Sequence, residues 1–330
     1  MRCLALAGLL RDRGAKSLFL CAETAGHLCD FIEDRGFPAA RMPISELPAG
    51  WKEDAEHTRA AIGSRKLQPH LLVVDHYKLD ARWERALRSF VGRIFVFDDL
   101  ADRSHDCDVL LDQNLHDCPE LRYKGLVSAE TRVFVGPRFA LMRPEFETRA
   151  ARLRDQGLQR LLVFFGGIDP TNEAFKLVSA LRILGERAPE TKLVLGPINP
   201  GAQDLRRFAA SIAKVAVIGA TDQMAKLITE ADLGIGTCGI SAWERCWLGL
   251  PALVVISADH QRDDARILQA LGAVRCLGDA ANVTIGDWVA ALRAVQTEPA
   301  ALLSMSHASA QVMRGRREAL RDLEAALVYP

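Results

Sequence analysis

Short apolar runs alternate along the chain with segments whose apolar residues recur at helical spacing. Runs such as Leu71–Val74, Arg93–Phe97 and Leu161–Phe165 are too continuously apolar for strands with one solvated face, so they predict strands buried in parallel sheets. Helical segments such as Arg82–Phe90 and Glu173–Leu184 lie between such runs. Strands alternating with helices predict an α/β fold of the doubly wound, Rossmann-like kind.

The alternation occurs twice and predicts two domains. It runs from a helix at Cys3–Arg13 to a strand at Arg132–Val135, within a first domain at 1–150. The charge-rich stretch Glu145–Gln159 is interpreted as an interdomain connection, and a second domain follows at 160–330. Its last helix is expected to pack back on the first domain. Other predicted strands are 17–21, 109–111, 192–195, 216–218, 233–235 and 252–256, and other predicted helices are 28–35, 202–212, 223–230, 242–248, 263–271 and 298–327.

Composition and charge argue against two classes of binding partner, nucleic acids and membranes. The 42 basic and 42 acidic residues cancel, and no basic stripe offers the face that a sequence-independent nucleic-acid binder needs. No apolar run is long enough to span a bilayer, and the charges at Arg11, Asp12 and Arg13 are wrong for a signal peptide. Eight scattered cysteines without a C-x-x-C pair indicate reduced thiols. We therefore expect a cytoplasmic monomer with no nucleic-acid or membrane partner.

The first candidate loop follows the predicted strand at 161–165 and contains Gly166, Gly167 and Asp169. Glycines let the backbone approach a phosphate, and the amides of the next helix attract it. The alternative is a tight turn in which Thr171 or Asn172 caps the helix. The residues alone leave both open.

The second candidate loop follows the predicted strand at 233–235 and contains Gly239. Ser241 and Glu244 have the S-x-x-E spacing of a capping box, which would only satisfy the free amides of the helix. In the functional interpretation those amides face a pyrophosphate and Glu244 accepts hydrogen bonds from a ribose diol. The two interpretations are compatible.

Polar residues also end other predicted strands. Ser257 to Gln261, with His260, follow one, and Asp75-His76-Tyr77 offer acid–base groups at another. Asp98-Asp99 suggest a metal site or a hydrogen-bonded turn, and the turn is favoured because no carboxylate cluster is near in sequence. The ligand-pair spacings of a metal site are absent around His105, so no metal is expected.

Taken together, these segments resemble a known enzyme family, the UDP-2,4-diacetamido-2,4,6-trideoxy-β-L-altropyranose hydrolases of pseudaminic acid biosynthesis. The resemblance covers nearly the whole chain. The matching blocks are Asp75–Tyr77, Phe97–Arg103 with Cys107-Asp108, Leu111–Asn114, Gly136-Pro137 with Ala140–Phe146, Phe165–Pro170, Trp243–Cys246 and Leu248–Pro251.

The resemblance implies a GT-B-like fold, with two Rossmann-like domains facing a cleft. It implies a metal-independent hydrolase without a cofactor, which binds a UDP-sugar and releases UDP by inverting water attack at the anomeric carbon. UDP is a good leaving group, so such an enzyme needs a base for water and dipoles for the pyrophosphate more than an acid. By similarity, Glu244 matches the acid that binds the ribose, and Tyr77 lies near the sugar. The expected substrate-binding residues are Asp75, Tyr77, Gly166, Gly167, Asp169, Gly239, Ser241, Glu244, His260 and Gln261.

Two departures from the family pattern matter. Family members open with a strand and a G-x-G-H loop, followed closely by the helix that here starts at Met1. The loop histidine, the family's proposed base, is therefore expected upstream of Met1, with the first strand, and no catalytic residue is expected within this sequence. A start site assigned at an internal Met is the favoured explanation over a shortened protein. The second departure is His260, where the family has Asn.

Two alternatives remain beside the hydrolase. One is a GT-B glycosyltransferase, which needs an acceptor where a hydrolase needs only water. The other is a non-catalytic UDP-sugar binder, because the base is absent from the chain as written.

Overall fold

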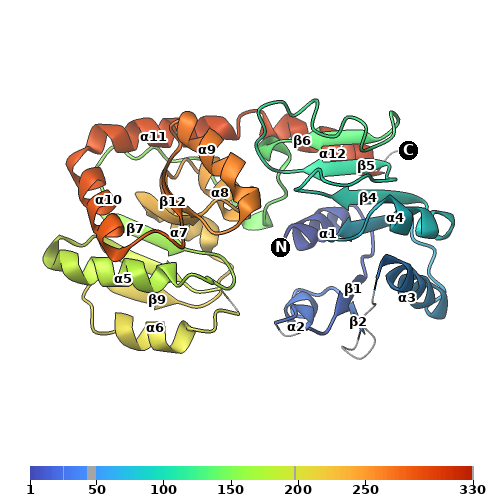
Figure 1. The fold of residues 1–330 in the computed structure, drawn as a ribbon, viewed down its shortest axis with the longest axis horizontal. Coiled ribbons are helices and arrows are strands. Elements are labelled where there is room, and N and C mark those ends of the chain that lie inside the picture. The colour runs from blue at the N-terminus through green and yellow to red at the C-terminus, as the bar shows by residue number, and fades with distance from the viewer. Residues whose placement is uncertain (25, 43–49, 197, 329–330) are drawn as a thin grey trace. The chain divides into compact units, whose positions relative to one another are not determined.

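The structure is a computed structural model that describes residues 1–24, 26–42, 50–196 and 198–328. The chain forms two compact units (Figure 1). The first unit contains Met1–Arg143 and Arg316–Pro330, and the second contains Pro144–Gly315. No helix of the described residues is long and apolar enough to cross a membrane.

The first unit is built on parallel strands in two separate ladders. β3 (Leu71–Asp75), β4 (Arg93–Phe97), β5 (Val109–Asp112) and β6 (Arg132–Val135) form one sheet in that order, and β1 (Phe19–Ala22) pairs with β2 (Ala39–Met42) in the other. The helices of this unit are α1 (Arg2–Asp12), α2 (Cys29–Glu33), α3 (Trp51–Ser64), α4 (Ala81–Leu87) and α12 (Arg316–Val328).

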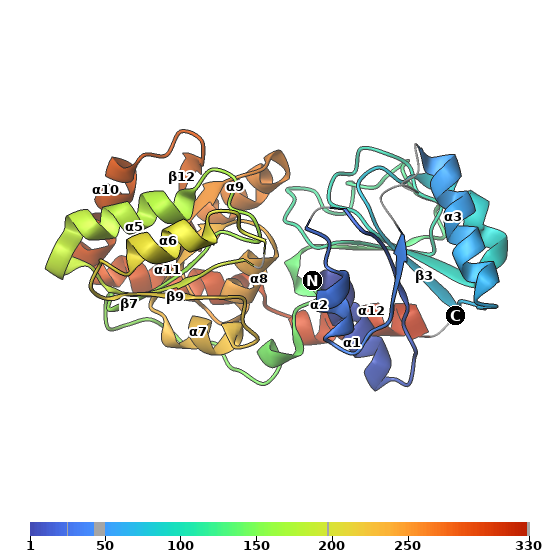
Figure 2. The same cartoon turned by 90° about the horizontal axis from the view of Figure 1, so that it is seen from below.

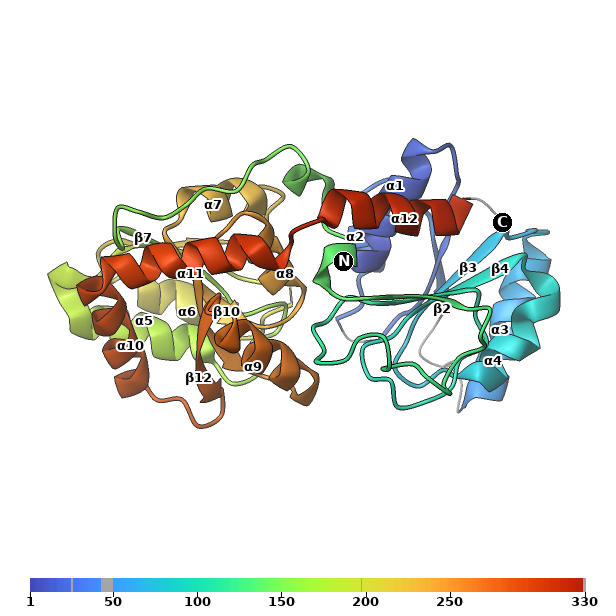
Figure 3. The same cartoon turned by 90° about the horizontal axis from the view of Figure 1, so that it is seen from above.

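Alternate residues of β4 bury opposite faces of the four-stranded sheet, as strand geometry requires. Phe95 and Phe97 pack in a cluster with residues of α1 and α12. Ile94 and Val96 pack in another cluster with residues of α3 and α4. All four side chains are essentially inaccessible to solvent. Helices α1 and α12, from opposite ends of the chain, therefore cover the same face (Figures 2 and 3).

The second unit contains one continuous parallel sheet of six strands in the order β12-β11-β10-β7-β8-β9. The strands are β7 (Arg160–Phe164), β8 (Glu190–Val194), β9 (Val215–Ile218), β10 (Leu233–Thr237), β11 (Ala252–Ile256) and β12 (Val274–Asp279). The helices are α5 (Glu173–Leu184), α6 (Ala202–Ala209), α7 (Met224–Glu230), α8 (Ile240–Trp247), α9 (Arg262–Ala270), α10 (Ile285–Thr297) and α11 (Pro299–Val312).

The order of these strands creates a topological switch point. From β7 the chain winds outward through β8 to β9, and it then returns to place β10 on the other side of β7. In open α/β sheets, ligands bind outside the carboxyl ends of the strands at such a point. The loops that follow β7 and β10 therefore occupy the position where this unit is expected to hold a ligand.

Most predicted elements are present, with boundaries within a few residues. Four elements were missed: β2, α3, β12 and α10. The tail predicted as one helical segment is two helices, α11 and α12, which belong to different units. The charged stretch Glu145–Gln159 belongs to the second unit, and its Arg154 is fully buried.

Candidate functional site

The predicted binding residues of the second unit lie after three neighbouring strands. Gly166, Gly167 and Asp169 follow β7, while Gly239 precedes α8 after β10. His260 and Gln261 follow β11. Because β11, β10 and β7 are adjacent and parallel, all these loops emerge at the carboxyl edge of one sheet, around the switch point.

The loop after β7 is a tight turn closed by an aspartate. Gly166 has a φ of +90°, which favours glycine. The Asp169 carboxylate accepts hydrogen bonds of 2.9 Å from the backbone amides of both Glu173 and Ala174, in the first turn of α5. Asn172 is the N-cap residue of this helix, as the tight-turn alternative predicted, but its side chain makes no cap hydrogen bond, and Asp169 accepts from the helix amides instead. These two amides of α5 are thus already satisfied by an anionic group of the chain itself.

The loop after β10 leads into helix α8, whose N-cap residue has no side chain with which to cap it. Gly239 is the N-cap of α8 and makes no side-chain cap hydrogen bond. The predicted capping box of Ser241 and Glu244 is wrong, because Ser241 lies within the helix. Glu244 is buried in the middle of α8. The first-turn amides of α8 are therefore more open to a ligand than those of α5.

The loop after β11 brings one predicted residue to the start of α8. The Gln261 side-chain oxygen accepts hydrogen bonds of 3.2 Å from the backbone amide and the hydroxyl of Ser257. A Cβ at Gly239 would lie 3.9 Å from Gln261 Nε2, so these two predicted residues are neighbours. Gln261 is buried, whereas His260 is exposed.

In the first unit, Asp75 and Tyr77 belong to one charge cluster at the ends of β3 and β4. Arg2 donates from Nε and Nη2 to both oxygens of Asp75, at 3.1 and 2.7 Å, and from Nη1 to both oxygens of Asp99, at 2.7 and 2.9 Å. The Tyr77 hydroxyl donates to Asp99 at 3.0 Å, and so does the side-chain amide of Asn114. One buried guanidinium therefore holds two carboxylates together.

This cluster fixes the protonation states of its members. Burial alone would raise the pKa of the Asp75 carboxyl, but the hydrogen bonds and charge of Arg2 outweigh it and lower that pKa. Burial and the neighbouring Asp99 carboxylate raise the pKa of Tyr77 to about 12. At neutral pH Asp75 is thus a weak base, and the half-exposed Tyr77 is a hydrogen-bond donor.

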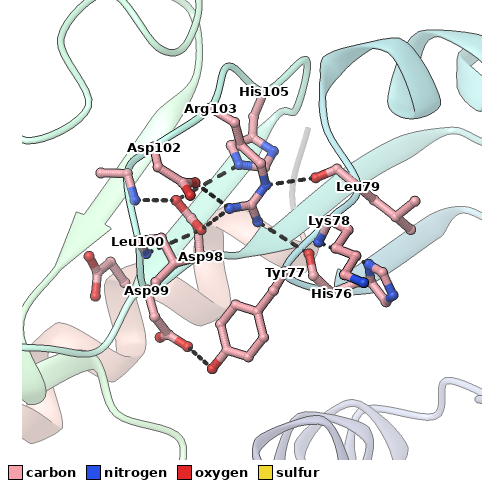
Figure 4. Close-up of polar contacts among 12 residues, drawn as sticks. His76, Tyr77, Lys78, Leu79, Asp98, Asp99, Leu100, Asp102, Arg103 and His105 are labelled. Atoms are coloured by element: carbon pink, nitrogen blue, oxygen red, sulfur yellow. Dashed lines mark hydrogen bonds and ion pairs between the residues drawn. The ribbon is translucent and has the colours of Figure 1, made fainter. Parts of the chain in front are cut away.

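A second polar network supports the loop that carries Tyr77 (Figure 4). Arg103 donates to the carbonyl oxygens of Leu79 and His76, at 2.8 and 3.2 Å, and pairs with the buried Asp98 carboxylate at 3.0 Å. The Asp98 carboxylate also accepts from the backbone amides of Leu100 and Ala101, so the prediction of a hydrogen-bonded turn is confirmed. His105 contacts the buried Glu84 at 2.6 Å.

No group of three or more His, Cys, Asp or Glu side chains in the described residues is placed to hold a metal ion. Sequence reasoning missed three residues that organise the two sites: Arg2, Asn114 and Arg245. Asn114 follows two residues after Asp112, the last residue of β5, so its place at a strand end was a signal that the sequence offered. Arg2 carried none, because its partners lie 73 and 97 residues away. Arg245 lies within the matching block Trp243–Cys246, but nothing in that block marked it as a buried side chain.

Residues 162–322 match the family model of the glycosyltransferase family 28 C-terminal domain. The crystal structure of MurG from Acinetobacter baumannii has a TM-score of 0.64 at 16% identity, and the match covers 98% of this chain and 95% of that one. The predicted fold is confirmed: it is the GT-B type with two Rossmann-like domains.

Two curated relatives extend the comparison. The UDP-2,4-diacetamido-2,4,6-trideoxy-beta-L-altropyranose hydrolase of Campylobacter jejuni is 29% identical over 218 residues, which are 65% of this chain and 71% of the relative. The spore coat polysaccharide biosynthesis protein SpsG of Bacillus subtilis is 29% identical over 165 residues. That alignment spans 48% of this chain and about half, 48%, of the relative. The predicted resemblance to the altropyranose hydrolases is thereby confirmed.

Proposed function

We propose that this protein hydrolyses a UDP-linked 2,4-diacetamido-2,4,6-trideoxy sugar to UDP and the free sugar, with water attacking the anomeric carbon and inverting it. The free sugar would serve pseudaminic or a related nonulosonic acid synthesis. The observation that carries the proposal is the switch point of the second unit, where glycine loops and the uncapped start of α8 meet. The likeness to the Campylobacter jejuni hydrolase supplies the substrate class.

The second unit is assigned to UDP. Amides at the start of a helix, together with its dipole, favour a diphosphate, and those of α8 have no side-chain cap. Glu244 lies one turn further along the same helix, and we assign its carboxylate to the ribose hydroxyls. Asp169 is assigned a smaller part, because its carboxylate is occupied by the amides of α5.

The first unit is assigned to the sugar. Tyr77 stays protonated at neutral pH and donates hydrogen bonds, which suits an acetamido oxygen or a hydroxyl. Asp75 is a weak base because Arg2 lowers its pKa, so we assign it to organising Arg2 rather than to taking the proton of the attacking water. Because UDP is a good leaving group, stabilising the charge that develops on its diphosphate is the larger part of the catalysis that we assign to the protein.

The test separates three activities. The protein is incubated with the UDP-linked diacetamido sugar and no acceptor, and UDP and the anomer of the released sugar are followed by NMR. Release of UDP with inversion supports the proposal. Release only after an acceptor glycan is added supports a glycosyltransferase, which the family 28 match favours as the second candidate. Tight binding without release under both conditions identifies a non-catalytic binder and contradicts the hydrolase.

Glu244→Gln tests the ribose assignment. Hydrogen bonds to a charged group contribute about 1.5–3 kcal/mol, so the affinity for UDP should fall roughly ten- to a hundredfold. Uridine should lose the same factor, because it carries the same ribose. Glu230 is a partly exposed acid at the end of α7 that pairs with Lys192 at 2.9 Å, so Glu230→Gln is the control and should bind both ligands normally. Unchanged UDP affinity in Glu244→Gln removes Glu244 from the site.

A further inference from the structure

Arg245 is a buried arginine without a carboxylate partner in the described part of the second unit. Only 4% of its surface is exposed. Its Nη2 donates to the carbonyl oxygen of Thr237 at 2.7 Å, and its Nη1 approaches the Ser241 hydroxyl at 3.3 Å. Its Nε has no hydrogen-bond partner among these residues. Because arginine remains charged in proteins, an unpaired buried guanidinium calls for an explanation.

Two glycines of β10 make room for this side chain. A Cβ at Gly234 would lie 2.7 Å from Arg245 Cδ, and one at Gly236 would lie 3.2 Å from Arg245 Nη1. The guanidinium therefore lies along the end of β10 and reaches Thr237 and Ser241, which stand on either side of the segment 238–240. The positive charge is thus delivered to the loop at the switch point.

The helix dipole makes this placement unfavourable unless an anion is present. Helical side chains lean toward the N-terminus of their helix, and that of Arg245 runs back to the start of α8, where the dipole is already positive. Arg154 shows the opposite case in the same unit. It donates to the carbonyl oxygens of Ile228, Ala231 and Leu248, at the C-terminal ends of α7 and α8, where a cation is favoured.

Among the described residues no carboxylate forms an ion pair with Arg245, and the adjacent buried Glu244 acts on it as a nearby charge without a direct hydrogen bond. Burial raises the pKa of the Cys238 thiol, so this neighbour remains neutral. The start of α5 receives the Asp169 carboxylate, whereas the start of α8 receives no side-chain cap. The N-cap residue of α8 therefore supplies no carboxylate of the kind that Asp169 supplies at α5, and the nearby Arg245 has no ion-paired partner among the described residues.

We propose that Arg245 is a positioning residue for an anionic ligand, the diphosphate of the nucleotide, which it favours through its buried charge and by holding Thr237 and Ser241 in place. This inference rests on the proposed binding of UDP by the second unit and assigns the group that recognises the diphosphate. The ligand supplies the negative charge that the chain supplies at α5.

The test compares UDP with uridine, which lacks the phosphates. Dissociation constants are measured by calorimetry for the intact protein, Arg245→Met and Arg245→Lys, with thermal melting to verify folding. In Arg245→Met the affinity for UDP should fall on the order of tenfold or more, while that for uridine stays close to the original. Arg245→Lys keeps the charge and should retain most of the preference for UDP. If the Met variant does not fold, Arg245→Gln provides the neutral side chain.

Arg154→Lys and Arg154→Met are the matched controls. They disturb a buried arginine at the other end of α8 and should lower stability without changing the ratio of UDP to uridine affinity. An unchanged ratio in the neutral Arg245 variants overturns the inference and leaves UDP binding intact. A protein that binds neither UDP nor uridine before any substitution instead refutes the proposed function, and the inference falls with it.

Discussion

The carboxyl ends of the two parallel sheets handle charge in opposite ways. In the first unit, Arg2 is buried between Asp75 and Asp99, with a carboxylate on each side. In the second unit, Arg245 is equally buried but its hydrogen bonds go to a carbonyl and a hydroxyl. The first arrangement is complete without a ligand, whereas Arg245 has no ion-paired carboxylate among the described residues.

This difference indicates which unit gains more stability when a ligand binds. A closed ion-pair cluster is a rigid support, so the first unit can hold the Tyr77 hydroxyl in one orientation. A site with an uncompensated charge sacrifices stability in the free protein and regains it when an anion binds. UDP should accordingly stabilise the second unit more than uridine does.

The largest expected effect comes from removing the cation of the first unit. Arg2→Met leaves two carboxylates, one of them buried, facing each other without a partner. Breaking a buried ion pair from one side costs roughly 3–5 kcal/mol in the free energy of unfolding. Urea unfolding measures the loss. Arg13→Ala, which removes an exposed pair with Glu324, should cost only about 0–1 kcal/mol, and equal losses would contradict the contrast.

Acid should loosen the first unit before the second. Hydrogen bonds and charges from Arg2 lower the pKa of Asp75 against the opposing effect of burial, and those from His116 and Arg122 do the same for Asp112. A carboxyl group whose pKa is lowered in the folded state stabilises the fold at pH values above its pKa in the unfolded state, near 3.9. This stability is lost as the pH falls through the pKa of the folded state. In the second unit the pKa of Asp232 is lowered in the same way, but burial raises that of Asp169, which therefore loses no stability on protonation.

The measurement is brief digestion with pepsin between about pH 4 and pH 2, a range set by the unfolded carboxyl value. Fragments from Met1–Arg143 should be released at a higher pH than fragments from Pro144–Gly315. Release of both sets of fragments at the same pH would show that protonation of the carboxylates destabilises the two units equally, which contradicts the prediction.

A smaller effect tests the cap that distinguishes α5 from α8. Asp169→Ala removes the acceptor of two helix amides and should lower the free energy of unfolding by about 0.5–2 kcal/mol. Asp169 has a φ of +53°, which Asn tolerates better than Ala, so Asp169→Asn is the control with a smaller loss. UDP affinity should hardly change in either. A large loss of UDP affinity at unchanged stability would place Asp169 at the ligand after all.

Patterns in the sequence predicted the buried strands well, because a run such as Arg93–Phe97 is apolar on both faces. Helix α3 was missed since only Ala55 and Thr58 are buried along it, which leaves almost no periodic signal. Strand β12 was missed because arginine and glycine interrupt its apolar positions. Helix α10 did carry a signal, the capping box of Thr284 and Asp287.

The candidate site was predictable only as far as strand ends are predictable. Gly166, Gly239 and Gln261 were found because each follows an apolar run, and the switch point then brings them together. The capping box of Ser241 and Glu244 failed because the helix begins two residues earlier than its spacing required. Arg2 reaches partners 73 and 97 residues away, so no local pattern distinguishes it from a surface arginine. Arg245 has nearby partners, but its burial follows from the glycines of β10 beside it.

The smallest expected effect on stability tests whether the cluster in the first unit handles the sugar. Tyr77→Phe removes one of the hydrogen bonds that Asp99 accepts, but Arg2 and Asn114 still donate to it, so the loss should be at most about 1 kcal/mol. Turnover of the UDP-sugar should fall while UDP affinity is unchanged. Tyr123→Phe is the matched control, because this buried hydroxyl donates to Asp112 at 3.0 Å. It should cost more stability than Tyr77→Phe and leave turnover intact. Equal turnover in the two variants would assign Tyr77 to the support of the fold rather than to the sugar.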